Sequence, residues 1–343
     1  MQDEKSFSFT GTGGEYFRIW IVNLFLTIIT LGIYSAWAKV RRMQYFNRNT
    51  WLNGSSFDYH GTPIAILKGR ILAVALFVLY NITIHSMPMV GLAVALMIAL
   101  VMPLLLVKSF RFRLFNTSYR GLRFGFFGSV KSAYMKFLLL PIFTLLTLYL
   151  LAPFTHQRIK AYQHGNSRFG KTEFAFDATA GSFYKIYFQA FLMFAALVSI
   201  FVFDTTTLFH MPRAPQPGNK NGFIIFILAI YVFLIVGGLL IVPFFISRLQ
   251  NLIWNHTTLG THRFASTISA RGIMWIILSN FVAIILTLGL FKPFADIRMA
   301  RYRVEHMALI PDGDLEAFIA DEKQQEDATG TEAAEIFDVD ISF

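Results

Sequence analysis

The sequence contains no cysteine, which excludes disulfide bonds, thiolate catalysis and cysteine-ligated metals. Charge is also scarce: Asp, Glu, Lys and Arg make up 15% of the chain, against roughly 25% in soluble globular proteins. The hydrophobic share is 55%, and 38 residues are phenylalanine. This composition excludes a single soluble domain and indicates an integral membrane protein.

The sequence also lacks the short motifs of common catalytic and metal sites. No GxxxxGK[ST], His-Glu-x-x-His or GxSxG string occurs, and the eight histidines are scattered. We therefore expect no cofactor, no metal site and no enzyme activity, and a lipid-modifying enzyme is the weakest functional hypothesis. No cleavable signal is recognisable at the N-terminus, so we expect the first apolar segment to act as an uncleaved insertion signal.

Acidic residues are concentrated at the C-terminus. Residues 305–343 hold twelve of the 20 acidic residues and one of the 30 Lys and Arg residues. We therefore divide the chain into a single polytopic membrane domain, 1–304, and an acidic cytoplasmic or peripheral tail, 305–343. The basic residues of the first part flank apolar stretches, which fits the positive-inside rule and anionic lipid headgroups better than nucleic acid. A protein partner for the acidic tail is a further expectation.

Seven apolar stretches approach or exceed the length of about 20 residues that a spanning helix needs. The sequence therefore predicts an α-helical integral membrane protein with about seven hydrophobic helices, at roughly 17–38, 69–85, 88–107, 134–154, 184–205, 223–246 and 273–295.

One segment occurs three times without gaps. Each copy begins at a Thr-Leu pair, has a bulky aromatic residue seven positions later, an arginine at eleven and a tyrosine at fifteen. The three copies begin at Thr30, Thr147 and Thr287. Such a regular recurrence predicts a repeated structural unit.

A second element alternates with the first. A phenylalanine follows eight residues after an Asn or His, with a glycine between them, at Asn49 to Phe57, Asn116 to Phe124, Asn166 to Phe174 and His256 to Phe264. Aromatic residues spaced by two after a glycine-containing turn predict short β elements. The order of all these elements predicts an internal duplication, roughly 1–115 and 116–304.

The distribution of basic residues leaves two topologies open. Seven crossings place 20 Lys and Arg residues on one side of the membrane and 10 on the other, a weak bias. If the first, fourth and seventh stretches are instead re-entrant, the division becomes 28 to 2. We take seven crossings as the primary prediction. The alternative would also let the Phe-x-Phe elements pair with the strand-like pattern of residues 337–343.

Candidate site residues come from the repeated segment. Each arginine precedes its tyrosine by four residues, so both lie on one face of a helix. They contact headgroups or an anionic ligand in one interpretation and anchor the chain at the membrane boundary in the other, which we favour. These residues are Arg41, Tyr45, Arg158, Tyr162, Arg298 and Tyr302.

Polar residues within the apolar stretches form a second set of candidates. Asn23, Asn81 and Asn280 either line a pathway or hydrogen-bond between helices, and the second role is the more usual. Asp296 stands nine residues after Thr287, and we expect it to form a salt bridge with Lys292 or Arg301.

The strings TLGIYSAWAKVRRMQYF, NTWLNGSSFDYHG and EIFDVDISF together resemble the YjgN-like bacterial inner-membrane proteins, catalogued as domain of unknown function 898. The resemblance covers nearly the whole chain. It implies a multi-pass protein of the Gram-negative inner membrane, but no reaction, ligand or catalytic residue. Our leading hypothesis is a transporter or channel-like protein for an anionic or lipidic ligand. The alternative is a membrane scaffold that recruits partners through its β elements and acidic tail.

Overall fold

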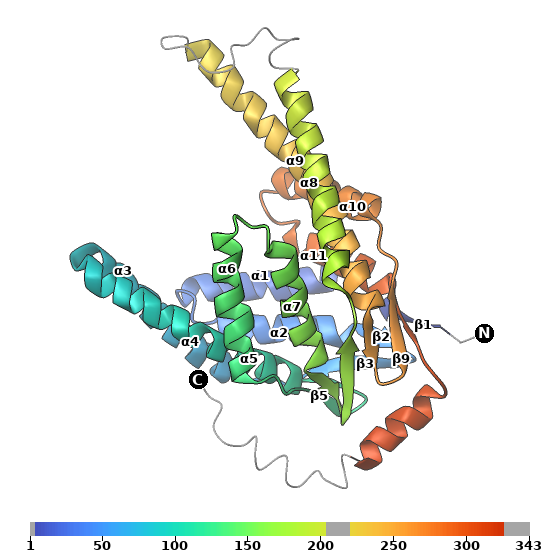
Figure 1. Cartoon of the computed structure of the whole chain (residues 1–343). Coiled ribbons are helices and arrows are strands. Elements are labelled where there is room, and N and C mark those ends of the chain that lie inside the picture. The colour runs from blue at the N-terminus through green and yellow to red at the C-terminus, as the bar shows by residue number, and fades with distance from the viewer. Residues whose placement is uncertain (1–3, 204–219, 326–343) are drawn as a thin grey trace.

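Ten short strands close into a barrel in the computed structural model, which describes residues 4–203 and 220–325 (Figure 1). Eight of the strands form four tight hairpins. These are β2 (Thr50–Leu52) with β3 (Ser55–Tyr59), β4 (Thr117–Tyr119) with β5 (Leu122–Phe126), β6 (Ser167–Phe169) with β7 (Thr172–Phe176), and β8 (Thr257–Leu259) with β9 (His262–Ser266).

The two remaining strands come from opposite ends of the chain and close the circle. β1 (Lys5–Phe9) pairs with β2 on one side and with β10 (Met307–Ile310) on the other, and β10 pairs in turn with β9. Every strand therefore has two neighbours, and the barrel has no free edge. The predicted β elements are strands, but they belong to one closed structure.

The glycine of each predicted β element lies in a hairpin turn. In the first hairpin, Asn53 and Gly54 have φ values of 44° and 75°, and in the second, Arg120 and Gly121 have 51° and 88°. Positive φ at both central residues is the property of the two-residue turn whose twist matches that of paired strands. The turn therefore fixes the register that points the following phenylalanine inward.

Aromatic and aliphatic side chains fill the barrel interior. One phenylalanine comes from the centre of each five-residue strand, and successive ring centroids lie 6.2, 6.3, 6.4 and 6.0 Å apart. These residues are Phe7, Phe57, Phe124, Phe174 and Phe264. A second, buried layer consists of Leu52, Tyr119, Phe169, Leu259 and Leu309. The barrel is thus the hydrophobic core that holds the helices in place.

All the connecting helices leave the barrel at the end opposite its hairpin turns. Two pairs are long: α3 (Pro63–Ser86) with α4 (Pro88–Phe115), and α8 (Ala180–Phe203) with α9 (Lys220–Asn255). Within the described part of the chain, these pairs supply four segments long and apolar enough to cross a membrane, 63–86, 88–115, 180–202 and 227–255. Many of their large hydrophobic side chains are exposed, as lipid-facing residues are.

The other helices form three shorter pairs. The first is α1 (Gly13–Ile29) with α2 (Ser35–Arg48). The second joins α5 (Val130–Tyr134), the π-helical η1 (Met135–Leu139) and α6 (Leu140–Leu146) to α7 (Ala152–Gly165). The third is α10 (Ala270–Leu286) with α11 (Lys292–Glu305).

Each short pair turns at a repeated Thr-Leu dipeptide. The three leucines have φ values of 51°, 49° and 50°, and the next residue also has positive φ. The threonine hydroxyl oxygen accepts a hydrogen bond from the backbone N–H four residues later, at 2.9, 3.3 and 3.0 Å in the three copies. The repeated segment therefore begins with a tight helix–turn–helix connection.

The prediction of about seven hydrophobic helices is wrong. The stretches 17–38, 134–154 and 273–295 each contain one of these turns, so none is a single helix. Hydropathy alone cannot distinguish a pair of short apolar helices from one long one. The closed barrel also requires each connection to return to the end that it left, which agrees with the re-entrant alternative. The duplication boundary near residue 115 remains a prediction.

A last helix, residues 315–325, covers the barrel at the end where the hairpin turns lie (Figure 1). Its residues Leu315, Phe318 and Ile319 close an apolar space of about 160 Å³ inside the barrel. The strand pattern predicted at 337–343 lies outside the described residues. Because the barrel strands have three to five residues, they are too short to span a bilayer, which takes about 9–11.

Candidate functional site

The three repeated tyrosines join the two helices of each short pair at their base. Tyr45 accepts a hydrogen bond from Thr12 N–H at 2.9 Å, Tyr302 accepts one from Ser269 N–H at 3.0 Å, and Tyr162 donates to the Ser129 carbonyl at 3.1 Å. In each pair the partner is the residue that caps the first helix. Burial and the nearby Glu15 carboxylate raise the pKa of Tyr45 to about 12. These contacts hold the fold together.

The structure does not bring the three repeated arginines together. Arg41 and Arg158 are exposed, with their guanidinium carbons 5.8 and 4.9 Å from the ring centroids of Tyr34 and Phe154. Arg298 instead donates to Asn280 Oδ1 at 2.7 Å and to Ser279 Oγ at 2.9 Å. The three residues therefore make different contacts and do not form one site.

The three asparagines also have different surroundings. Asn280 binds Arg298 and donates to the Ala295 carbonyl at 3.4 Å, so it links α10 to α11. Asn81 donates to the Phe77 carbonyl of its own helix at 2.8 Å. Asn23 is 7% exposed, and its Oδ1 is buried without a hydrogen-bond partner among the described residues.

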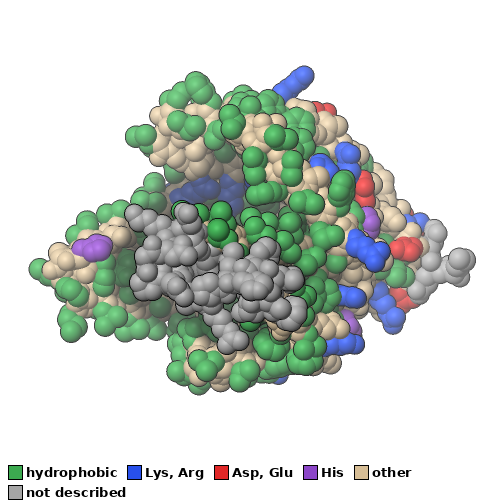
Figure 2. All heavy atoms as spheres, turned by 90° about the horizontal axis from the view of Figure 1, so that it is seen from above, with side chains coloured by type: hydrophobic (Ala, Val, Ile, Leu, Met, Phe, Trp, Pro, Cys, Tyr) green, Lys and Arg blue, Asp and Glu red, His purple; other side chains and the backbone are tan. Residues whose placement is uncertain are grey.

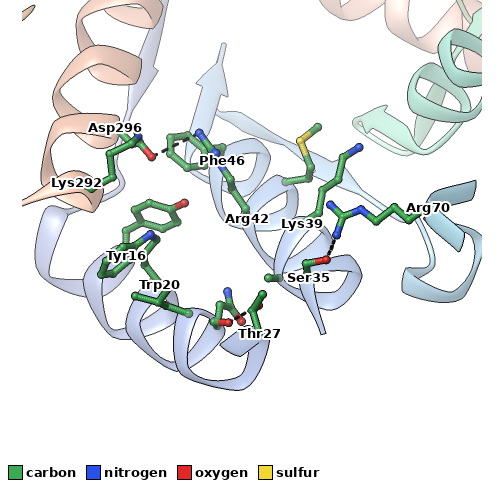
Figure 3. Close-up of a pocket in the computed structure, with 14 residues that line it drawn as sticks. Tyr16, Trp20, Thr27, Ser35, Lys39, Arg42, Phe46, Arg70, Lys292 and Asp296 are labelled. Carbon is green, nitrogen blue, oxygen red and sulfur yellow. Dashed lines mark hydrogen bonds and ion pairs between the residues drawn. The ribbon is translucent and has the colours of Figure 1, made fainter. Parts of the chain in front are cut away.

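A cavity of about 690 Å³ lies between α1, α2, α3 and α11 (Figure 3). We call it the α1–α2 cavity. Its charged lining consists of Lys39, Arg42, Arg70, Lys292 and Asp296, and its uncharged lining includes Tyr16, Trp20, Asn23, Thr27, Ser35 and Phe46. Seen from above, Lys and Arg side chains lie at the bottom of a hollow bordered by hydrophobic side chains (Figure 2).

The single carboxylate of the cavity neutralises only part of its positive charge. Asp296 pairs with Lys292, as the sequence predicted, and with Arg42 at 3.5 Å. Arg70 donates to Ser35 Oγ, whereas Lys39 has no hydrogen bond or ion pair with any described residue. Four basic groups and one carboxylate give the lining a net charge of +3, and Asp296 pairs with only two of the four basic groups. The arrangement suits an anionic ligand.

The surroundings of Lys39 disfavour its positive charge. Lys39 is an exposed residue, but partial burial of its amino group lowers its pKa, and the charges of Arg70 and Arg113 lower it further. Burial and Arg113 likewise lower the pKa of Lys160 on α7. Basic groups from four helices therefore lie within electrostatic reach of one another, and an anion among them would raise both pKa values.

Sequence reasoning missed most of the cavity lining. Ser35, Lys39, Arg42 and Phe46 follow one another at intervals of three or four residues, so they share a face of α2, and this periodicity was a usable signal. Arg70 lies on α3, and no pattern in the sequence connects it with α2. The described residues contain no group of three or more His, Cys, Asp or Glu side chains that could hold a metal ion.

Comparison with known proteins identifies the family to which this sequence is similar. The family model described as "Bacterial protein of unknown function (DUF898)" matches residues 4–336. "Inner membrane protein YjgN" of Salmonella typhimurium is 26% identical over 366 aligned positions, which cover 93% of this chain and 92% of that protein. "Inner membrane protein YjgN" of Escherichia coli (strain K12) is 36% identical over 138 positions, 40% of this chain and 35% of that protein. No solved structure matches the chain.

Proposed function

The chain belongs to the DUF898 family, whose curated relatives are inner membrane proteins, and we propose that it binds the headgroup of an anionic phospholipid in the α1–α2 cavity. In this proposal, binding is one step of a transport-type, non-enzymatic role in the inner membrane. The observation that carries it is the excess of positive charge in an open cavity with partly apolar walls.

The topology supports a cytoplasmic position for the cavity. The barrel and the bases of all helix pairs lie on one side of the four candidate spans, and residues 204–222 of the sequence contain two of the 30 Lys and Arg residues. The positive-inside rule then assigns the barrel to the cytoplasm. The cavity, which lies between α1, α2, α3 and α11, would face the cytoplasmic leaflet, where anionic headgroups are available.

The cavity chemistry fits a phosphate ester with an apolar body. Arginine presents donors in a planar arrangement that matches phosphate oxygens, and lysine adds a mobile positive charge. Arg42, Arg70 and Lys39 offer both kinds of group from two helices. Trp20 and Leu24 on α1 provide an apolar wall for the glycerol backbone or the upper acyl chain.

Two neighbouring cations on α2 provide a test. Lys39→Gln removes the unpaired cation of the cavity, whereas Arg41→Gln removes one that is stacked on Tyr34 and is not part of the cavity lining. One phosphate contact by a basic group is worth about 1 kcal/mol, which corresponds to roughly a fivefold change in affinity. We therefore expect Lys39→Gln to lower the retention of phosphatidylglycerol by about that factor and Arg41→Gln to leave it unchanged.

The measurement is the lipid content of the purified protein, exchanged into nanodiscs of phosphatidylcholine with a small fraction of phosphatidylglycerol and read by native mass spectrometry. Size-exclusion profiles of both variants show whether they are folded. An equal loss of phosphatidylglycerol in the two variants would mean that retention depends on the general surface charge and not on the cavity. If Lys39→Gln retains phosphatidylglycerol relative to phosphatidylcholine as well as the wild-type protein does, binding in this cavity is contradicted.

Among the described residues, the β elements offer a scaffold no free strand edge for a partner. Recruitment by β elements requires an unpaired strand edge, and every barrel strand already has two neighbours. The described part of the acidic tail contributes β10 and the helix 315–325, both of which pack on the barrel itself. We therefore propose ligand binding and not recruitment through the strands.

A further inference from the structure

The first and third short helix pairs have an asparagine at the same repeat position, but its side-chain hydrogen bonds differ between them. Asn23 and Asn280 both lie seven residues before the threonine of their turn. In the third pair, Arg298 donates to Asn280 Oδ1 at 2.7 Å. In the first pair the corresponding Arg41 lies over the Tyr34 ring, and Asn23 Oδ1 has no partner among the described residues. The repeat thus shows which bond the first copy lacks.

The neighbours of Asn23 do not compensate for the missing donor. Thr27 donates its hydroxyl hydrogen to the backbone carbonyl of Asn23 at 2.6 Å, and Ser35 donates to the Gly32 carbonyl. An unsatisfied buried acceptor costs about 1–3 kcal/mol, so native proteins rarely retain one without a function. Asn23 Oδ1 has almost no accessible surface in this orientation. Asn23 lines the α1–α2 cavity, however, and rotation of its side-chain amide about the Cβ–Cγ bond turns Oδ1 toward a molecule bound there, which can supply the donor.

We propose that Asn23 is a specificity-determining residue of the α1–α2 cavity and accepts a hydrogen bond from a hydroxyl group of the ligand, next to a phosphate bound by Lys39, Arg42 and Arg70. This inference rests on the proposed function and narrows it to a phosphate ester that carries a hydroxyl, as in a phosphoglycerol headgroup. A headgroup of the same charge that lacks the hydroxyl leaves Asn23 Oδ1 unpaired, and it binds more weakly.

A comparison of two lipids distinguishes the contribution of the headgroup hydroxyl from that of the phosphate charge. Phosphatidylglycerol and phosphatidylmethanol are both monoanionic phosphodiesters, and only the first has free hydroxyls. In the nanodisc assay, we expect the wild-type protein to retain phosphatidylglycerol about tenfold better, the ratio that one hydrogen bond of roughly 1.4 kcal/mol gives. Asn23→Leu should reduce this ratio to about one while still retaining both anionic lipids in preference to phosphatidylcholine.

Asn280→Leu is the matched control, because it changes the same repeat position at a residue whose acceptor is already bound by Arg298. It should leave the ratio at the wild-type value. Asn23→Ala, checked by size exclusion, serves as the second variant if Asn23→Leu does not fold. A ratio of one in the wild type, or an unchanged ratio in the Asn23 variants, overturns the inference while headgroup binding stands. If neither anionic lipid is retained, the proposed function fails and this inference fails with it.

A soluble competitor identifies the source of the headgroup. Displacement of bound phosphatidylglycerol by sn-glycerol 1-phosphate at a comparable concentration supports the same chemistry with a soluble ligand. Retention of the lipid in its presence supports the lipid as the ligand.

Discussion

Two glutamates on the helix 315–325 hold it on the barrel in different ways, and their removal should have very different effects. Glu322 is 4% exposed and accepts hydrogen bonds from Lys171 N–H, at 2.7 Å, and from Thr172 Oγ1. Glu316 pairs with Arg120 and accepts from Asn53 at 2.8 Å, but its side chain is 59% exposed. The Arg120 guanidinium lowers the pKa of Glu316.

The expected loss of docking free energy in each variant depends on how deeply the carboxylate is buried and not on the number of charges that it contacts. Hydrogen bonds to a buried carboxylate contribute about 1.5–3 kcal/mol each, so Glu322→Ala should weaken the docking of the helix by about 3 kcal/mol in total. The ion pair of Glu316 is screened by solvent, so Glu316→Ala should have a much smaller effect. Coupled to local opening, the value for Glu322→Ala gives roughly a hundredfold increase in amide exchange of the helix, and Glu316→Ala should leave exchange close to that of the wild type.

Hydrogen–deuterium exchange of the amides in 315–325, read by mass spectrometry in detergent, measures this directly. Amides of the barrel strands β3 and β5 serve as the internal reference, because global unfolding would accelerate them as well. If Glu316→Ala accelerates exchange of the helix as much as Glu322→Ala does, the reasoning from burial is wrong.

Two further predictions concern the turns and the topology. Gly32→Ala places a side chain at φ 92°, where no atom lies within 4 Å, so it should lower stability by about 1–2 kcal/mol through backbone strain alone. Gly14→Ala in α1, where the space is also open, should raise stability by roughly 0.5–1 kcal/mol. The measurement is the thermal unfolding midpoint of each variant in detergent, and shifts of the same sign in both variants would contradict the assigned turn. For the topology, single cysteines can be introduced into the cysteine-free chain at Lys171 and at Met89, which is 83% exposed. Impermeant reagents should label Lys171→Cys only from the cytoplasm and Met89→Cys only from the periplasm, and labelling of both from one side would contradict the two-sided arrangement.

Much of the local structure could be predicted because it depends on residues close together in the sequence. The Thr-Leu turns and the glycine-containing hairpins require particular hydroxyl groups and positive φ angles. The same residue types therefore recur at the same spacing in each copy. Closure of the barrel could not be predicted in this way. β1 and β10 come from opposite ends of the chain, and a strand of four or five residues does not identify its partner.

The helix count failed for a related reason. A hydropathy window sums apolar residues and does not register that a two-residue turn of positive φ reverses the chain. The better signal was the distribution of Lys and Arg, since the 28 to 2 division already favoured helices that return to the side they left.

Comparison of the three copies also separates the residues that the fold requires from those that are free to differ between copies. A residue needed for the turn or for the base of each pair must recur in every copy. The threonine accepts the same backbone hydrogen bond in each copy, and the tyrosine always bonds the residue that caps the first helix of its pair. A residue that binds one ligand in an asymmetric cavity has no reason to recur. Nine positions after the threonine, the three copies carry Lys39, His156 and Asp296. His156 hydrogen-bonds Tyr187 Oη at 3.1 Å and Asp296 pairs with Lys292, whereas Lys39 lacks a partner among the described residues. Of the three residues at this position, Lys39 is therefore the one whose charge is unpaired among the described residues, and it lies where we propose that an anion binds.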